Sequence, residues 1–183
     1  QNRSVIGTTA ISTVTAELRP PFVIKGVGLA HKSEHAAVHL GVLPKDVIDV
    51  ATHIGTNEIL IEEMITGAVA ELLVGVTRDA AHGYVLTLGA GGVLTEILRD
   101  TVSMLLPVQA EDVETALGTL NCAPLLSGYR GKPAADVDAI VEAVLAVQSY
   151  VLANAETVSE VEINPLLCTP DRAVAVDALI RKA

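Results

Sequence analysis

Aromatic side chains are nearly absent from this sequence, whose 183 residues include three Tyr, one Phe and no Trp. Proteins that bind single-stranded nucleic acids stack the bases on aromatic side chains, so this scarcity argues against that class. Basic residues are also few, with 12 Lys and Arg against 22 Asp and Glu and a formal net charge of −10. Such a surface does not favour a nucleic-acid backbone or an anionic membrane. A local pocket for a nucleotide is still compatible with it.

Cysteine is scarce as well. Cys122 and Cys168 are the only two, and the absence of a CxxC motif argues against a zinc site or a redox pair. We expect two buried free thiols in a reducing cytoplasm. No apolar run approaches the ~20 residues that a membrane-spanning helix needs, and no signal peptide is visible. The first residue is Gln, which suggests a piece of a longer chain.

Aliphatic residues dominate what is present, because 50% of the sequence is hydrophobic and the core must be built from Val, Leu, Ile and Ala. Strand-like and helix-like segments alternate, which predicts an α/β or α+β class with a lobe boundary at Gly67. Strands are expected at Phe22–Lys25, Ala37–Val42, Glu58–Glu63, Ala70–Val76, Tyr84–Leu88, Val158–Ile163 and Ala173–Ile180. Helices are expected at residues 9–18, Pro44–Ile54, Val93–Arg99, Glu111–Leu120 and Asp136–Asn154.

Lys25 stands at the end of an apolar strand. Burial of an unpaired ammonium is costly, so this side chain either reaches solvent or neutralises a bound phosphate. The next segment holds His31, His35 and His39. Their spacing would align on a helix and invites a metal interpretation, but the flanking residues favour loop and strand. A solvated loop and a phosphate-binding loop are the alternatives.

A glycine-rich turn, Gly89-Ala90-Gly91-Gly92, joins a predicted strand to a predicted helix. Such a unit gathers backbone N–H groups and a helix N-terminus at one place, which suits an anion. The spacing matches neither the GxGxxG nor the P-loop motif, so both of those interpretations are excluded. A tight turn that needs positive φ is the alternative explanation.

Asn164-Pro165 lies between two apolar strands, and Asp177 lies in the second of them. Two strands joined by a turn can bring Asn164 and Asp177 side by side. An amide oxygen and a carboxylate are ligands that Mg²⁺ prefers, with phosphates and water completing its shell. An Asx turn at Asn164 and an ordinary surface aspartate form the alternative.

Taken together, these segments resemble the ATP-grasp domain of NDP-forming acyl-CoA synthetases, relatives of the succinyl-CoA synthetase β subunit. The matching stretches are FVIKGVGLAHKSEHAAVHLG, ILIEEMITGAVAELLVGVTRDAAHGYVLTLGAGGVLTEILRD, PLLSGYRGKPAADVDA and EVEINPLLCTPDRAVAVDALI. They follow one another over about residues 10–181. The resemblance implies an α+β ATP-grasp fold with a small lobe at residues 1–64, incomplete at its N-terminus, and a larger lobe at residues 65–183.

The resemblance also implies a nucleotide contact for each matching residue. Lys25 would touch the phosphates, and Glu71 would hold the ribose. The interlobe hinge against the adenine would be formed by Glu62, Glu63 and Met64. Family-like loops hold Gly91, Gly92 and Arg130, and the arginine would meet phosphate or a partner.

The metal ligands and catalytic residues follow from the same resemblance. Asn164 and Asp177 match the pair that binds Mg²⁺. His31 is similar to a histidine that carries phosphate, and Glu162 is similar to a glutamate near the docking site of a phosphohistidine. With Lys25, these two residues form the implied catalytic set.

The implied activity is acid–CoA ligation with conversion of ATP to ADP through a phosphohistidine. ATP, ADP and Mg²⁺ would bind to this chain, whereas CoA would bind outside it, on a CoA-binding or ligase domain or subunit that carries the phosphohistidine. We therefore expect a cytoplasmic ligase fragment that is inactive alone and binds neither nucleic acid nor membrane. Exposed apolar surface would allow it to form a homo-oligomer.

A rival from another class is a non-catalytic ATP-grasp-like regulatory module of a protein acetyltransferase. Ala36 and Ala37 stand where the family often has two glycines, which stiffens the loop and favours the regulatory module. The retained lysine, glutamate, asparagine and aspartate favour catalysis. A carboxylate–amine ligase would need a complete acyl-phosphate pocket, which the sequence does not reveal.

Overall fold

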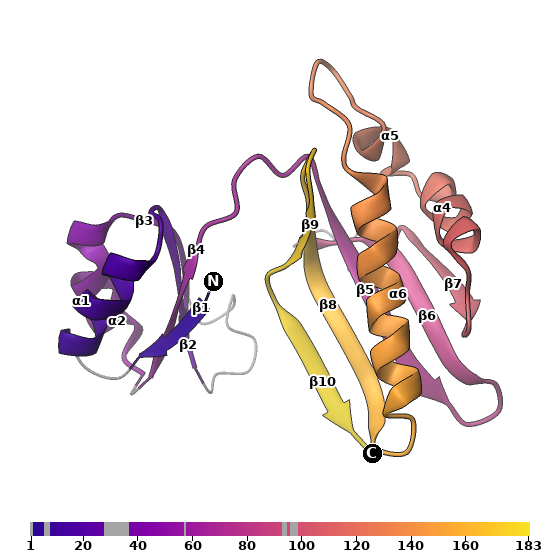
Figure 1. Ribbon diagram of the computed structural model, residues 1–183, viewed down its shortest axis with the longest axis horizontal. Helices are drawn as coiled ribbons and strands as arrows, with labels where there is room; N and C mark the ends of the chain where they lie inside the picture. The colour runs from indigo at the N-terminus through magenta and orange to yellow at the C-terminus, as the bar shows by residue number, and fades with distance from the viewer. Residues whose placement is uncertain (1, 6–7, 28–36, 57, 93–94, 96–98) are drawn as a thin grey trace. The chain divides into compact units, whose positions relative to one another are not determined.

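The structure is a computed structural model that describes residues 2–5, 8–27, 37–56, 58–92, 95 and 99–183. The chain divides into two compact units, Gln1–Thr66 and Gly67–Ala183, and each is described by itself. Each unit carries helices on an antiparallel sheet, which makes the fold α+β (Figure 1).

In the Gln1–Thr66 unit, the sheet of the described residues has the order β1-β4-β2-β3, and each pair is antiparallel. The strands are β1 (Asn2–Val5), β2 (Phe22–Gly26), β3 (Val38–Val42) and β4 (Ile59–Glu63). The helices are α1 (Thr8–Glu17), the short 3-10 helix η1 (Pro44–Asp46) and α2 (Val47–Ile54). Gly55 ends α2 with a left-handed φ of 70°, the usual conformation after a helix.

Alternation along the strands decides which face of this sheet is buried. Four strand residues share one core with residues of α1 and α2 and are at most 4% exposed: Phe22, Ile24, Ile59 and Ile61. The residues that alternate with them along the strands lie on the opposite face. Lys25 and Glu62 are among these, so the two charged side chains share the face that does not point to the α1 and α2 core.

In the Gly67–Ala183 unit, the sheet of the described residues has the order β10-β8-β5-β6-β7, and β9 also pairs with β8. The strands are β5 (Ala70–Asp79), β6 (Gly83–Ala90), β7 (Thr101–Leu105), β8 (Val158–Cys168), β9 (Ala173–Ala175) and β10 (Ala178–Lys182). The helices are α4 (Ala110–Thr119), α5 (Ala123–Leu126) and α6 (Val137–Ala153).

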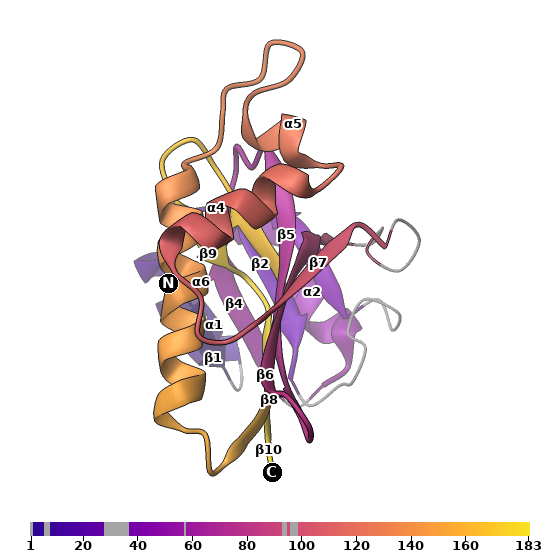
Figure 2. The ribbon, with the colours of Figure 1, turned by 90° about the vertical axis from the view of Figure 1, so that its right-hand side faces the viewer.

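Helices α4 and α6 lie on the same face of this sheet (Figure 2). Helix α6 begins after Asp136, whose carboxylate accepts a hydrogen bond from the N–H of Ala139 at 3.0 Å. Along α6, Ile140, Val144 and Val151 are fully buried against inward residues of β5, β6 and β8. No helix among the described residues of this unit covers the opposite face of the sheet, which carries the outward residues of the same strands.

The sequence does not predict β1 or β7, and both are present. Strand β1 pairs along β4 although its residues lack an apolar alternation. Strand β7 does alternate, with Val102 and Met104 packed against the core, and it pairs with β6. The predicted helix Val93–Arg99 lies mostly outside the described residues.

The predicted turn at Asn164-Pro165 is wrong, because β8 continues through both residues. The pairing of β5 with β8 shifts register between Leu72 and Val74, so β8 has an extra residue at this place. A bulge tolerates a proline inside a strand, since the missing N–H falls where the ladder is already interrupted. The chain reverses instead after β8, and the single strand expected at residues 173–180 is divided into β9 and β10.

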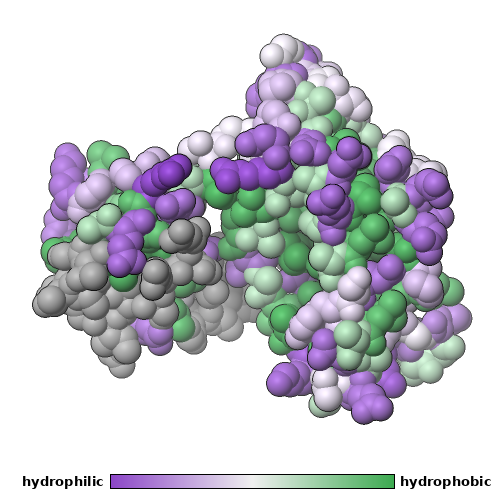
Figure 3. All heavy atoms as spheres, viewed as in Figure 1, coloured by the Kyte–Doolittle hydropathy of each residue, from purple (hydrophilic) through white to green (hydrophobic). Residues whose placement is uncertain are grey.

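No helix of the described residues is long and apolar enough to span a membrane. The visible face of the Gly67–Ala183 unit carries both hydrophobic and hydrophilic residues (Figure 3). Large apolar side chains such as Leu105, Leu152 and Ile180 are about half exposed, at 54%, 44% and 48%.

Candidate functional site

The start of β5, the turn that ends β6 and the middle of β8 meet at one end of the Gly67–Ala183 sheet. The N–H of Gly91 donates to the carbonyl oxygen of Glu71 at 2.8 Å. The N–H of Gly92 donates to Oδ1 of Asn164 at 2.9 Å. Gly92 has a φ of 76°, and a methyl group on it would overlap the Glu71 carboxylate. The glycine turn therefore brings Glu71 and Asn164 against the same residue.

Asn164 and Asp177 face each other on neighbouring segments of the chain. The N–H of Asn164 donates to the carbonyl oxygen of Asp177 at 3.2 Å, which continues the ladder between the β8–β9 and β8–β10 pairs. Residues opposed in this way carry their side chains on one face of an antiparallel pair. The Asn164 side chain is half-buried, and Asp177 is exposed. The sequence-based expectation that both residues share one site stays a prediction for their side-chain oxygens.

The side chains at this end of the sheet offer oxygen atoms that could bind a metal ion. Glu71 and Asp177 offer carboxylates, and Oδ1 of Asn164 keeps a second lone pair after it accepts the Gly92 N–H. Among the described residues, no three His, Cys, Asp or Glu side chains gather to hold a metal ion. A metal at this place would therefore combine the amide oxygen with few carboxylates and with oxygens of a substrate or water, which is the manner of Mg²⁺.

Glu162 lies two residues before Asn164 in β8. It pairs with Gly75 of β5 and Leu179 of β10. Its neighbour Ile163 belongs to the core under α4 and α6, so Glu162 lies on the opposite face of the sheet. It is half-buried there, on the same strand as Asn164.

Lys25 and Glu62 form an ion pair in the other unit. The distance from Lys25 Nζ to Glu62 Oε2 is 2.6 Å, and the side chains are only 9% and 16% exposed. Lys25 is opposite Leu60 and Glu62 is opposite Val23, so the charged residues are diagonal neighbours across β2 and β4. The strand lysine is therefore neutralised by a residue expected at the hinge.

The two residues after Glu62 are also held by their own unit. The Glu63 carboxylate accepts a hydrogen bond from the N–H of Arg19 at 3.0 Å. The N–H of Met64 donates to the carbonyl oxygen of Pro21 at 2.9 Å. Both contacts fasten the end of β4 to the segment that precedes β2. Contact of either residue with adenine stays a prediction.

Arg130 lies in the loop between α5 and α6, which projects beyond the sheet (Figure 1). Its guanidinium lies over the ring of Tyr129, 5.3 Å from the centroid, and its φ of 49° is left-handed. Among the described residues, its ring contact is with Tyr129 and not with Glu71 or Asn164. His31 and Ala36 lie outside the described residues, and Ala37 is buried before β3.

The sequence model of the ATP-grasp domain family matches residues 3–181 of the chain. The chain belongs to the ATP-grasp family. The matched region includes both units and the residues of the site described above.

Curated relatives of this ATP-grasp chain are CoA ligases and synthases. The β subunit of ADP-forming acetate–CoA ligase II of Pyrococcus furiosus is 33% identical over 112 residues, which are 60% of this chain and 48% of that subunit. The trans-feruloyl-CoA synthase of an unknown prokaryotic organism is 33% identical over 177 residues, which are 87% of this chain and 25% of the synthase. The chain thus spans about half of the first relative and a quarter of the second.

Solved structures share the ATP-grasp fold over the whole chain. A crystal structure from Pyrococcus horikoshii OT3 superposes with a TM-score of 0.89 at 25% identity, covering 100% of this chain and 83% of that one. The dinucleotide-forming acetyl-coenzyme A synthetase 1 of Candidatus Korarchaeum cryptofilum, in complex with coenzyme A and Mg-AMPPCP, superposes at 0.86 with 26% identity, covering 100% and 84%.

Asp100 is a polar residue of this ATP-grasp domain that the sequence does not single out. It is 8% exposed, and its carboxylate accepts hydrogen bonds from the N–H and Nδ2 of Asn121, at 2.8 and 3.0 Å, and from the N–H of Cys122 at 3.0 Å. Burial raises the pKa of Asp100, but these hydrogen bonds outweigh it, and the pKa lies below its usual value. Its carbonyl oxygen accepts from the N–H of Ala90. Asp100 therefore ties the strand before the glycine turn to the α4–α5 connection.

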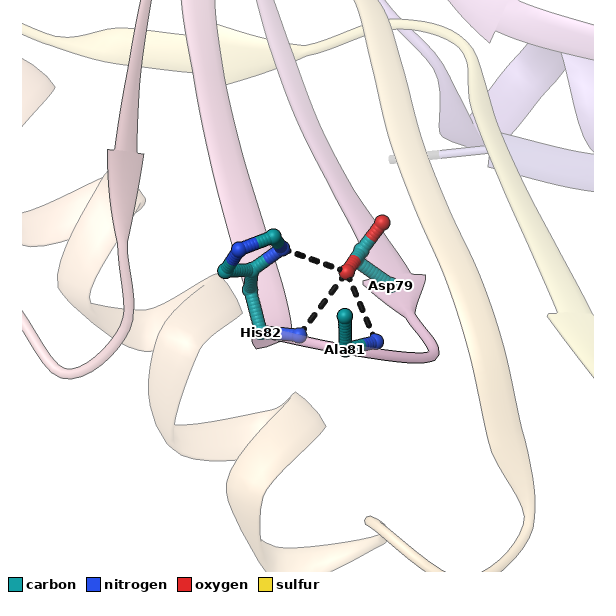
Figure 4. A network of polar contacts seen from close by, with 3 residues as sticks. All are labelled: Asp79, Ala81 and His82. Carbon is teal, nitrogen blue, oxygen red and sulfur yellow. Dashed lines mark hydrogen bonds and ion pairs between the residues drawn. The ribbon is translucent and has the colours of Figure 1, made fainter.

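A second polar network closes the β5–β6 hairpin, at the opposite end of β5 from Glu71 (Figure 4). Oδ1 of Asp79 accepts from the N–H groups of Ala81 and His82 at 2.9 and 2.8 Å and lies 2.8 Å from Nδ1 of His82. The Ala81 N–H, then the His82 ring and N–H, lower the pKa of Asp79. The network is exposed and orders a turn, so it is not part of the site.

Proposed function

We propose that this chain is the nucleotide- and Mg²⁺-binding ATP-grasp part of an ADP-forming acid–CoA ligase. The whole enzyme makes acyl-CoA while ATP becomes ADP, and phosphate passes through a histidine on a CoA-binding domain or subunit. The relatives described above are named as ligases and synthases, which favours catalysis over a regulatory module of an acetyltransferase.

The observation that carries this proposal is the contact of Gly92 with both Asn164 and Glu71. Three segments that are far apart in sequence bring side-chain oxygens together there. This donor set fits a magnesium–nucleotide complex, since Mg²⁺ prefers a few protein oxygens together with phosphate oxygens. Asn164 and Asp177 would hold the metal, and Glu71 would hold the nucleotide beside them.

Positive charge for the phosphates comes from Lys25. Phosphoryl transfer needs little covalent chemistry from the protein, and positioning and charge neutralisation supply most of the rate. The ammonium of Lys25 is fixed by its ion pair and by a central strand, so it is already oriented before a ligand arrives. Glu162 lies on the same strand as Asn164 and is available for the docking of the phosphohistidine segment.

Calorimetric titration with ADP, in excess Mg²⁺ and in EDTA, tests the binding half of the proposal. We expect Mg²⁺ to strengthen ADP binding, and Asn164→Ala and Asp177→Ala to weaken the Mg²⁺-dependent part by about tenfold or more. Glu142→Gln, on the exposed side of α6, removes one negative charge away from the site and should leave binding unchanged. Binding that is indifferent to Mg²⁺ and to both variants would contradict the assignment.

ADP release from ATP, CoA and a panel of short and aromatic acids tests the catalytic half. We expect release that depends on both acid and CoA when the chain is joined to its CoA-binding domain or subunit, and none from the chain alone. Acid- and CoA-dependent release of ADP by the chain alone would contradict the assignment of CoA binding to a separate domain or subunit. ADP release that needs neither acid nor CoA would contradict the ligase assignment.

A further inference from the structure

Glu62 lies against the lysine expected to bind phosphate, and its carboxylate is 2.6 Å from that ammonium. We propose that Glu62 is a positioning residue that acts as the exchangeable counter-ion of Lys25. Its carboxylate pairs with the ammonium before a nucleotide binds, and the phosphate chain then takes its place. Glu62 therefore sets the affinity for polyphosphate and does not select the base. This inference rests on the proposed nucleotide function.

The sheet register holds the two charges together. Lys25 and Glu62 occupy diagonal positions on β2 and β4, which are the two central strands of the described sheet order. A backbone so paired cannot slide by one residue without turning Phe22, Ile24 and Ile61 out of the core. The ammonium and the carboxylate are therefore brought together by the fold itself, whether or not a ligand is present.

Burial makes this pair consequential for an incoming anion. With side-chain exposures of 9% and 16%, neither charge is well solvated, and a buried charge without a partner is strongly unfavourable. Within the pair the two charges oppose each other, so a phosphate meets attraction from Lys25 and repulsion from Glu62. Removal of the carboxylate charge removes that repulsion and keeps the ammonium. At roughly 6 Å and partial screening, one charge changes anion affinity by about tenfold.

A contact with the base would give a different pattern. The 6-amino group of adenine can donate to a carboxylate, whereas the O6 of guanine would be repelled by it. Loss of a base contact would weaken ATP alone and leave a ligand without a base unaffected. Loss of a counter-ion acts on the phosphate chain and therefore affects ATP, GTP and inorganic tripolyphosphate alike.

The experiment measures the affinities of these three ligands, with Mg²⁺, for the wild-type chain and for Glu62→Gln. We expect Glu62→Gln to bind all three about tenfold more tightly, with a steeper loss of affinity as salt is added. Damage to the fold weakens binding, so a gain in affinity separates this role from a structural one. Asp49→Asn removes an exposed negative charge from α2 of the same unit and should change none of the affinities.

Glu62→Asp covers the case in which Glu62→Gln does not fold. It keeps the charge but withdraws it by one methylene, and we expect a smaller gain, shared by all three ligands. Weaker binding of ATP alone would overturn the counter-ion role in favour of a base contact. Unchanged affinities in a folded variant would overturn it while leaving the nucleotide function intact. If neither the wild-type chain nor a folded Glu62 variant binds any of the three ligands, the proposed function itself fails.

Discussion

Oδ1 of Asn164 accepts a hydrogen bond from the backbone N–H of Gly92 at 2.9 Å, across 72 residues of sequence. The bond fixes which end of the amide faces the glycine turn, because only the oxygen can accept. It also connects β8 to the end of β6, two strands that are separated in the sheet by β5. The site thus depends on the conformation of one glycine.

Replacement of Gly92 by alanine tests that dependence. The left-handed φ of 76° costs an alanine about 1 kcal/mol, and the new methyl group displaces the Glu71 carboxylate. Gly83→Ala is the matched control, since its φ is 85° and nothing lies within 4 Å of the added carbon. We expect both variants to lose about 1 kcal/mol of unfolding free energy. We expect only Gly92→Ala to lose Mg²⁺-dependent ADP affinity, and equal affinities in the two would remove Gly92 from the site.

Much of the fold follows from local pattern. The helix expected at Asp136–Asn154 and the buried strand expected at Phe22–Lys25 are both present, as α6 and β2. Strand β1 is not legible, because Asn2–Val5 becomes a strand through its pairing with β4 and not through its own residues. Asn164-Pro165 predicts a turn on propensity, yet the register shift beside Leu72 turns the same residues into a bulge.

The site is harder to predict from the sequence than the fold, because its contacts depend on the register of the strands. Sequence motifs single out Lys25 and Glu62 separately, and only the antiparallel pairing of β2 with β4 makes them diagonal neighbours. Asp100 carries no motif at all. Its partners lie 21 and 22 residues further along the chain, so nothing local marks it as the anchor of the α4–α5 connection.

Asp100→Asn should destabilise the Gly67–Ala183 unit. The neutral amide weakens three hydrogen bonds and turns a donor toward N–H groups, which costs about 2 kcal/mol at pH 7. The pKa of Asp100 is lowered in the folded state, so its contribution is full above the unfolded pKa of about 3.9 and is lost as pH falls through the folded pKa. Urea unfolding followed by circular dichroism at several pH values measures the difference.

The difference between wild type and Asp100→Asn should therefore be constant from about pH 5 to 7 and shrink below about pH 4. Glu142→Gln, an exposed carboxylate on α6, should show almost no difference at any pH. A destabilisation by Asp100→Asn that persists undiminished in acid would show that packing, and not the charge, is responsible.

Tyr84→Phe tests the fastening of β6 to the end of α6. The Tyr84 hydroxyl is bonded to the carbonyl oxygens of Ala155 and Val158, in the segment that connects α6 to β8. Its removal leaves a buried acceptor without this donor and should cost about 1–2 kcal/mol of unfolding free energy. Tyr150→Phe, on an exposed part of α6, removes the same group with little effect expected. Similar losses in the two variants would contradict a specific role for the Tyr84 hydroxyl.

The two thiols should be unreactive in the folded chain. Burial, together with the negative charge of Asp100, raises the pKa of Cys122 to about 11, and burial raises that of Cys168 to about 12. Since the thiolate is the reactive form, Cys122 should react with a disulfide reagent at pH 8 about two orders of magnitude more slowly than an unfolded cysteine. Asp100→Asn should accelerate the reaction of Cys122, because it removes the charge that opposes ionisation of the thiol, whereas Glu142→Gln should not.

In Cys122→Ser the remaining thiol, Cys168, is fully buried and should be labelled only as fast as the chain unfolds. Rapid labelling of Cys168 in the folded chain would show that the core around β8 opens far more readily than its burial implies. Cys122 is only partly buried, contrary to the sequence-based expectation of two buried thiols, and its rapid labelling would contradict its raised pKa.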